Sequence, residues 1–242
     1  MLELKNISFG VRGQNGDDKE ILQDISFTIE KGSFLVITGP NGGGKSTLAK
    51  LIMGIEKPTE GQILLNGEDI TGLTATERAR MGIGFAFQQP VRFKGLTVHD
   101  LLSLSAGRGL HTDEACRYLS EVGLCALDYI DRELNASLSG GELKRIEIAM
   151  LLARGTVLSV FDEPEAGIDL WSFQNLIRAF EKMRDTTSGS VVIISHQERI
   201  LAIANKIVVI AGGKVCTMGE RDEILPGILA EPDDCAFFRG VV

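Results

Sequence analysis

Apolar residues along the chain follow two patterns, and each predicts a different kind of strand. Largely apolar runs at 34–37, 157–161 and 191–194, of which the second contains Ser159, end directly at polar residues, which is typical of buried strands in a parallel sheet. Residues 2–9 and 24–30 instead alternate apolar and polar positions, so we expect strands with one exposed face. Together these segments predict an antiparallel layer beside a parallel core.

Turn residues place further boundaries in this arrangement. The segment 13–19 is polar and turn-rich, and a short strand at 61–67 ends in an Asn-Gly turn. Residues 206–218 contain two apolar runs around two glycines, which predicts a hairpin. From Pro226 onward the chain is weakly patterned.

Helical spacing is concentrated in the middle of the chain. A short helix is expected at 76–80, before a strand at 83–87. Residues 97–133 repeat apolar positions at helical spacing and predict an inserted helical subdomain. A further helix begins after Leu138-Ser139-Gly140-Gly141-Glu142, with one apolar stripe that includes Leu143 and Ile146.

The segment Gly39–Thr47 lies between a predicted buried strand and a predicted helix. It fits the pattern G-x-x-x-x-G-K-[ST] of a phosphate-binding P-loop. Its glycines let successive N–H groups point inward, and the helix that follows adds its positive dipole end. Lys45 would reach the β- and γ-phosphates, and Ser46 would take one position on Mg²⁺. The nucleotide-binding residues expected here are Gly39, Pro40, Asn41, Gly42, Gly43, Gly44, Lys45, Ser46 and Thr47.

Two adjacent carboxylates follow the apolar run at 157–161. Carboxylates at the end of a buried strand are costly unless they have partners or a chemical role. Asp162 fits a Mg²⁺ ligand, and Glu163 would polarise the water that attacks the γ-phosphate.

Four other positions each admit a functional and a structural explanation. Gln88, just past a strand, would reach Mg²⁺ or the attacking water, or it is a solvated loop residue. His196 would hydrogen-bond a phosphate or cap the next helix. Ser139-Gly140-Gly141 forms either an anion site at a helix N-terminus or a plain N-cap. Phe9 would stack on a base or pack in the core.

The net charge and the hydropathy of the chain exclude some classes of binding partner. The 242 residues carry a net charge of −8 and a pI of about 5.0, which argues against broad binding to nucleic acid or anionic membranes. No apolar run approaches the roughly 18–20 residues of a membrane span, so we expect no direct membrane insertion. No secretory signal is recognisable, so a cytoplasmic location is expected. Cys116, Cys125, Cys216 and Cys235 lack metal-ligand spacing and are interpreted as thiols.

The order of these motifs, together with Asp169, resembles the ATP-binding cassette (ABC) ATPases from about residue 2 to 220. The Ser-Gly-Gly-Glu signature is discriminating because most other P-loop ATPases lack it. The resemblance implies an α/β P-loop NTPase fold with a RecA-like parallel-sheet core, an antiparallel β subdomain and a helical subdomain. It implies one ABC domain over 1–242: an ATP-binding core with the β subdomain at 1–90 and 155–220, the helical signature subdomain at 91–154, and a tail at 221–242.

The resemblance also implies a role for each motif residue. Phe9 stands where the family has an adenine-stacking aromatic residue, usually Tyr. Ser139, Gly140 and Gly141 would contact the γ-phosphate of an ATP held by a second subunit. The remaining assignments are Gln88 as the Q-loop residue and a Mg²⁺ ligand, Asp162 as Walker B, Glu163 as the catalytic carboxylate, Asp169 as the D-loop aspartate and His196 as the switch histidine. The implied protein is a Mg²⁺-dependent ATPase that forms an ATP-dependent homodimer.

Within the family, some segments resemble the ATPase of Suf-type iron–sulfur cluster assembly (SufC-like). These are Glu77–Arg80, His196–Leu201 and the acidic segment Glu163–Asp169. The implied partner is a soluble Suf-like scaffold protein (SufB/SufD-like) that holds the nascent cluster. Pro164 and the segment 95–98 are instead typical of transporters. The alternative is therefore the ATP-binding subunit of a membrane ABC transporter, with a permease docked by the segment after Gln88.

Overall fold

The computed structural model describes residues 1–12, 18–89, 93–134 and 138–230. Its centre is a six-stranded sheet in the order β10-β9-β3-β8-β7-β6. All neighbouring strands are parallel except the β9–β10 hairpin, which is antiparallel. These strands are β3 (Phe34–Thr38), β6 (Ile83–Ala86), β7 (Leu158–Asp162), β8 (Ser190–Ile194), β9 (Lys206–Ala211) and β10 (Lys214–Glu220). The predicted parallel core and the predicted hairpin are confirmed.

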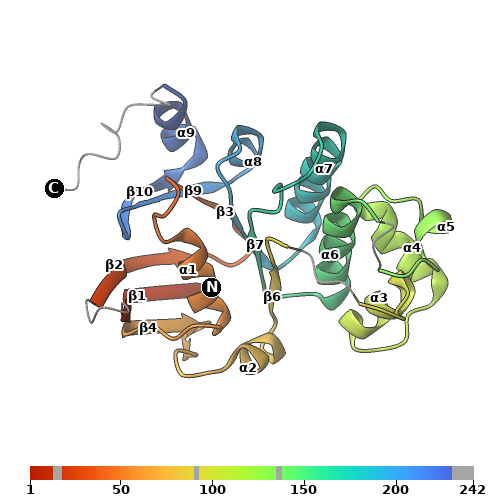
Figure 1. Cartoon of the computed structure of the whole chain (residues 1–242), viewed down its shortest axis with the longest axis horizontal. Coiled ribbons are helices and arrows are strands. Elements are labelled where there is room, and N and C mark those ends of the chain that lie inside the picture. The colour runs from red at the N-terminus through yellow and green to blue at the C-terminus, as the bar shows by residue number, and fades with distance from the viewer. Residues whose placement is uncertain (13–17, 90–92, 135–137, 231–242) are drawn as a thin grey trace.

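A second sheet of four antiparallel strands lies at the lower left in Figure 1, in the order β2-β1-β4-β5. Its strands are β1 (Leu2–Arg12), β2 (Asp18–Ile29), β4 (Glu60–Leu65) and β5 (Glu68–Asp69). Asn66 and Gly67 form the expected turn with φ of 51° and 87°. The turn prediction for 13–19 is wrong at its end, because Asp18 and Lys19 belong to β2 and pair with Arg12 and Val11. Residues 13–17 lie outside the described residues.

Helices cover both faces of the central sheet. The helix α1 (Lys45–Met53) lies between the two sheets, and α3 to α6 form the helical subdomain at the right of Figure 1. The other helices are α2 (Ala75–Arg80), α3 (Val98–Ala106), α4 (Thr112–Glu121), α5 (Ala126–Tyr129), α6 (Gly140–Arg154), α7 (Leu170–Thr186), α8 (Glu198–Ala202) and α9 (Arg221–Ala230). The fold is that of an α/β P-loop protein with a mixed sheet and an antiparallel β subdomain.

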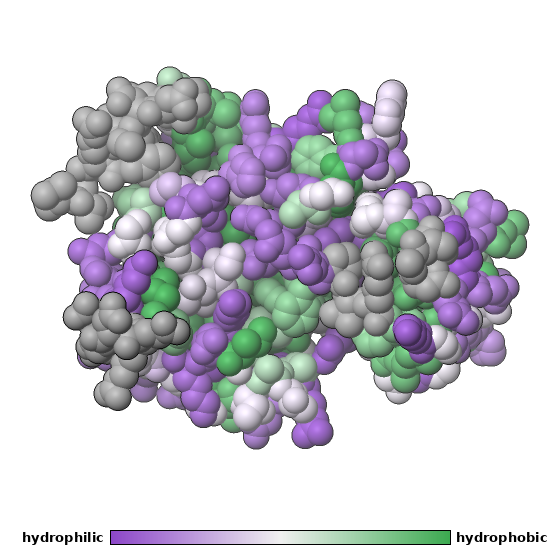
Figure 2. Space-filling model, in the orientation of Figure 1, coloured by the Kyte–Doolittle hydropathy of each residue, from purple (hydrophilic) through white to green (hydrophobic). Residues whose placement is uncertain are grey.

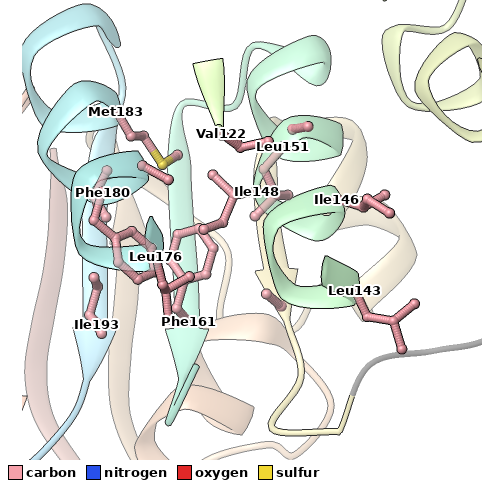
Figure 3. Packing of buried hydrophobic residues seen from close by; sticks show 14 of the residues in the cluster. Val122, Leu143, Ile146, Ile148, Leu151, Phe161, Leu176, Phe180, Met183 and Ile193 are labelled. Atoms are coloured by element: carbon pink, nitrogen blue, oxygen red, sulfur yellow. The ribbon is translucent and has the colours of Figure 1, made fainter. Parts of the chain in front are cut away.

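The continuous apolar strands divide their side chains between two cores. In β7, Val160 packs on the α1 side, whereas Phe161 packs on the side of α6 and α7. Phe161 and Phe180 meet edge to face with ring centroids 5.0 Å apart, and Ile148 and Leu176 lie around them (Figure 3). Burial on both faces explains why the strand has no polar alternation.

The helix α6 buries more than the single stripe that was predicted. Leu143 and Ile146 are buried as expected, but Ile148 and Leu151 are buried too. The helix packs against α3 and α4 on one side and α7 on the other, which occupies most of its circumference.

A buried arginine joins α1 to α2. The Arg78 side chain has no exposed surface, and its guanidinium donates to the carbonyl oxygens of Leu51, Ile52, Thr71 and Leu73. Two of these carbonyls belong to the last turn of α1, where carbonyls lack intrahelical partners. Arg78 therefore fixes the C-terminal end of the helix whose N-terminal end follows the P-loop.

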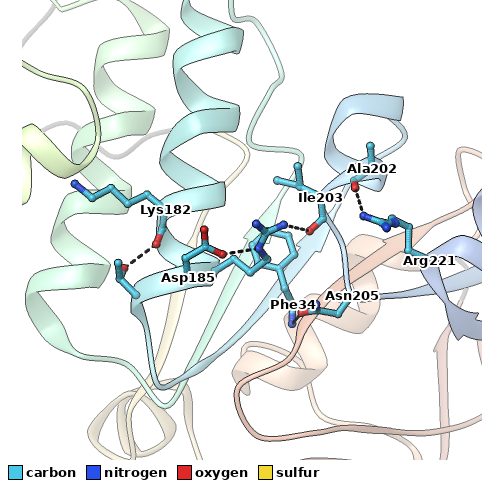
Figure 4. A network of polar contacts seen from close by, with 9 residues as sticks. Phe34, Lys182, Asp185, Ala202, Ile203, Asn205 and Arg221 are labelled. Carbon is cyan, nitrogen blue, oxygen red and sulfur yellow. Dashed lines mark hydrogen bonds and ion pairs between the residues drawn. The ribbon is translucent and has the colours of Figure 1, made fainter.

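Asn205 fixes the start of β3 in a similar way. Its Oδ1 accepts from the Phe34 N–H at 2.9 Å, and its own N–H donates to the Phe34 carbonyl at 2.8 Å (Figure 4). Nearby, the Arg184 guanidinium donates to the Ile203 carbonyl. These contacts hold the strand that leads directly into Gly39.

Residues 221–230 form a helix, although the sequence is weakly patterned from Pro226 onward; residues 231–242 lie outside the described residues. The helix α9 contains Pro226, which removes one backbone donor. Its Ile224, Leu225 and Ile228 side chains pack against the larger core and offset that loss.

The visible surface is mixed in character. Hydrophilic and hydrophobic residues are interspersed over the face shown in Figure 2. Among the described residues, no helix has the length and apolar content required to cross a bilayer.

Candidate active site

The P-loop lies at the carboxyl end of β3 and surrounds a small cavity. Residues 41–47, together with Ile21 and Glu163, line a cavity of about 170 Å³. Gly39 has a φ of 134°, and a Cβ there would come within 2.0 Å of the Ile210 carbonyl oxygen. Only glycine fits, because β9 passes directly against the loop.

Lys45 is held by its own loop. Its side chain is 6% exposed, and Nζ donates to the carbonyls of Gly39 at 2.8 Å and Pro40 at 2.9 Å. Burial lowers the pKa of Lys45, while Glu163 and Asp162 oppose that shift. The ammonium is therefore placed at the cavity with two hydrogen bonds that an anionic ligand can replace.

Ser46, which lines the cavity, contacts Asp162 at the end of β7, and the sequence predicts both residues as ligands of one cation. The Ser46 hydroxyl donates to Asp162 Oδ1 at 3.0 Å. Burial raises the pKa of Asp162, and the Ser46 hydrogen bond partly offsets the shift. A buried carboxylate beside a hydroxyl is a donor set of hard oxygens, so these residues fit Mg²⁺.

Gln88 and Glu163 are also in contact. Gln88 Nε2 donates to Glu163 Oε2 at 2.7 Å, although 75 positions separate the two residues. Glu163 has a φ of 44°, the left-handed region that a glutamate rarely adopts. Such backbone strain is concentrated at functional sites.

Sequence reasoning missed a carboxylate close to this pair. Glu165 Oε1 accepts from the Ser195 hydroxyl at 2.5 Å, and Ser195 Oγ also accepts from the Gln197 N–H at 3.0 Å. These two bonds brace the backbone on both sides of His196, whose ring is exposed and lies 3.4 Å from Gln197 Nε2. Burial raises the pKa of Glu165, and the hydrogen bond from Ser195 partly opposes the shift. The acidic segment was noticed in the sequence, but nothing there indicated its contact with Ser195.

The signature residues form a separate group. The Ser139 hydroxyl caps α6 in a capping box with Glu142. A Cβ on Gly141 would lie 2.4 Å from Ser172 Cβ in the first turn of α7, which Asp169 caps. Ser139, Gly140, Gly141 and Asp169 are thus gathered in one place, but none of them lines the P-loop cavity.

Phe9 also lies away from the cavity lining. It is 9% exposed and packs in the core between the antiparallel sheet and α1. The apolar side chain at the cavity is instead that of Ile21 in β2.

Comparisons with known proteins agree with this geometry. Residues 22–166 match the family described as ABC transporter. An uncharacterized ABC transporter ATP-binding protein of Methanocaldococcus jannaschii is 39% identical over 86% of each chain. The lipopolysaccharide export system ATP-binding protein LptB of Escherichia coli is 31% identical over 93% of this chain and 92% of LptB.

Solved structures give the same result. A dimeric bacterial ABC transporter cassette has a TM-score of 0.80 and 25% identity, over 91% of this chain and 99% of that one. A nucleotide-free cassette from an ABC transporter has a TM-score of 0.79 and 26% identity, over 99% of both chains. The chain therefore belongs to the ABC transporter ATP-binding family and is an ABC ATPase.

Proposed function

We propose that this chain is the ATP-binding and ATP-hydrolysing subunit of an ABC transporter and acts on a membrane partner docked beside Gln88. The observation that carries the proposal is an apolar groove of about 210 Å³ next to that residue. Aromatic side chains from the end of β6 and the segment after it line one side, and Met150 and Leu151 of α6 line the other. Phe87 is 45% exposed and Phe93 is 36% exposed.

The groove suits an amphipathic helix of a permease. Exposed aromatic residues next to a catalytic loop are costly to leave in water and typically mark a partner site. Glu147 and Arg154 add polar groups to the lining of the groove. A groove lined by apolar side chains typically binds the apolar face of one amphipathic helix. Movement of the docked helix would displace Phe87 and, through the backbone, the adjacent Gln88.

The ATP chemistry follows from the cavity. Lys45 and the loop N–H groups would bind the phosphates, and Ser46, Asp162 and Gln88 would hold Mg²⁺. When bound, Mg²⁺ supplies positive charge that neutralises the phosphates. Glu163 would accept a proton from the attacking water and orient it. His196 would donate a hydrogen bond to the γ-phosphate.

A second copy of the chain would complete the site. The signature group at Ser139 and Asp169 faces no phosphate within its own subunit, so it would act on the ATP of the partner cassette. Dimeric relatives support this arrangement. We therefore propose an ATP-dependent homodimer with two ATPs held between its subunits, at the cytoplasmic face of a membrane.

A second candidate is a Suf-type ATPase that drives a soluble SufB/SufD-like scaffold. Its support is the acidic segment around Glu165, where transporters have Pro-Thr-Ser-Ala-Leu-Asp, together with His196–Leu201. Glu165 accepts a hydrogen bond from Ser195, the residue directly before the segment His196–Leu201. The named transport relatives favour the first candidate, whereas the relative at 39% identity has no stated cargo.

The test is gentle affinity purification from native extract, followed by mass spectrometry. The chain is compared with Phe93→Glu, which puts a charge into the groove, and with Leu127→Glu, a control at a side chain that is 88% exposed. A polytopic membrane protein that Phe93→Glu loses and Leu127→Glu retains supports the transporter. A soluble partner without membrane spans supports the Suf-type candidate. A partner retained by Phe93→Glu contradicts docking in the groove.

A further inference from the structure

A buried lysine in the signature helix has no role in the chemistry described above. The Lys144 side chain is 2% exposed, one turn after Gly141 in α6. Its ammonium donates to the Phe87 carbonyl and forms an ion pair with Glu147 Oε2 at 3.3 Å. Burying an ammonium costs several kcal/mol, and an apolar side chain would fill the same space at lower cost.

One partner of this ammonium is the peptide group that precedes Gln88. The Phe87 carbonyl belongs to the peptide bond between residues 87 and 88, so holding it fixes the backbone at Gln88. Gln88 in turn donates to Glu163 Oε2 at 2.7 Å. Lys144 thus lies one peptide from the only described contact between the Gln88 side chain and the catalytic carboxylate.

The surrounding charges keep the ammonium at this position. Burial lowers the pKa of Lys144, while Glu147, Asp162 and Glu165 all oppose the shift. Two of these carboxylates belong to the segment that ends β7, so the lysine is attracted toward the active-site side of α6. Salt screens such a buried attraction only weakly.

We propose that Lys144 is a positioning residue for hydrolysis. It holds the Gln88 side chain against Glu163, and it does so only while α6 keeps the orientation that places Lys144 at the Phe87 carbonyl. The inference rests on the proposed role of Gln88. A shift of α6 that withdraws Lys144 would release the Phe87 carbonyl, and the Gln88 amide would lose its alignment. A misplacement of about 1 Å at such a contact reduces a rate by about 100-fold. Binding of the phosphates at Lys45 would be little affected.

The experiment uses the full chain and compares Lys144→Met with Lys144→Arg, and with Lys182→Met as a control at an exposed lysine of α7. The steady-state ATPase rate and the affinity for a fluorescent ATP analogue are measured at a temperature where circular dichroism shows every variant folded. We expect Lys144→Met to lower kcat by about tenfold or more while KM changes by less than about threefold. Lys144→Arg should restore part of kcat, and Lys182→Met should match the unmodified chain.

Each variant is also combined with Gln88→Ala. If Lys144 acts through Gln88, Lys144→Met should cause no further loss in the Gln88→Ala background. If the two losses multiply, or if Lys144→Met changes only the melting temperature, the inference is refuted. If Gln88→Ala itself leaves kcat unchanged, the proposed role of Gln88 fails instead. If Lys144→Met does not fold, Lys144→Gln, which keeps a donor but no charge, replaces it in the same cycle.

Discussion

Replacing Arg78 by alanine should destabilise the fold strongly, although the residue is far from the phosphate cavity. The substitution removes the four hydrogen bonds that the guanidinium donates, at 2.6 to 3.2 Å. The Leu51 carbonyl keeps a bond from the Gly54 N–H. The carbonyls of Ile52, Thr71 and Leu73 lose the guanidinium as their hydrogen-bond donor.

The magnitude follows from these three carbonyls. Leaving a buried polar group without a partner costs about 1–3 kcal/mol. Water that enters the space left by the side chain would recover part of this cost, so we expect a loss of about 4 kcal/mol in the free energy of unfolding. For a chain of this size the melting temperature should fall by about 8–16 °C.

The assay is urea and thermal unfolding followed by circular dichroism, with Arg80→Ala as the control. Arg80 lies on the same short helix but is exposed, so its loss should change stability by less than about 0.5 kcal/mol. A loss below about 1 kcal/mol for Arg78→Ala would refute the reasoning. It would mean that water satisfies the carbonyls as well as the guanidinium does.

Three further predictions concern the site itself. Lys45→Ala should abolish tight ATP binding because the only side-chain cation lining the described cavity is lost; unchanged affinity for a fluorescent ATP analogue would contradict its assignment. Glu163→Gln should bind ATP, hydrolyse it very slowly and accumulate as a dimer in size-exclusion chromatography; a normal turnover rate would mean that another group positions the water. The third prediction concerns stability against pH. Since burial raises the pKa of Glu165 above its ordinary value of 4.5, the folded state holds that proton more tightly, and its contribution to stability falls as pH rises from 4.5 through the raised value. Glu165→Gln should remove this decline in urea unfolding measured from pH 4.5 to 8; an unchanged pH profile would show that Glu165 does not cause it.

Much of the fold was predictable because strands that are buried on both faces are apolar at nearly every position. Residues 34–37 and 191–194 are apolar throughout because both faces of the sheet are covered, and their carboxyl ends had to meet at one edge. The P-loop was predictable for a different reason: Gly39 and Lys45 occupy fixed spacings that phosphate binding requires.

The buried charges could not be predicted from the sequence. Arg78 and Lys144 are of residue types that are mostly exposed, and their main partners are backbone carbonyls, which any residue supplies. No side-chain pattern therefore marks the contact. Phe9 shows the reverse problem, since an aromatic residue in an alternating strand fits a base platform and a core position equally well. The helix at 221–230 was not predicted, because the sequence is weakly patterned from Pro226 onward and proline is rare inside helices.

The division of β7 between two cores also limits how the length of the chain can vary. Val160 and Asp162 lie on the same side of the strand, which faces α1 and Ser46, and Phe161 lies on the other. Deleting one residue from 158–160 would turn Phe161 toward α1 and carry the Asp162 carboxylate away from Ser46. Packing and chemistry would fail together, so no later substitution at a single position could restore both. Insertions and deletions that survive selection should therefore avoid β7 and collect in connections such as 107–111.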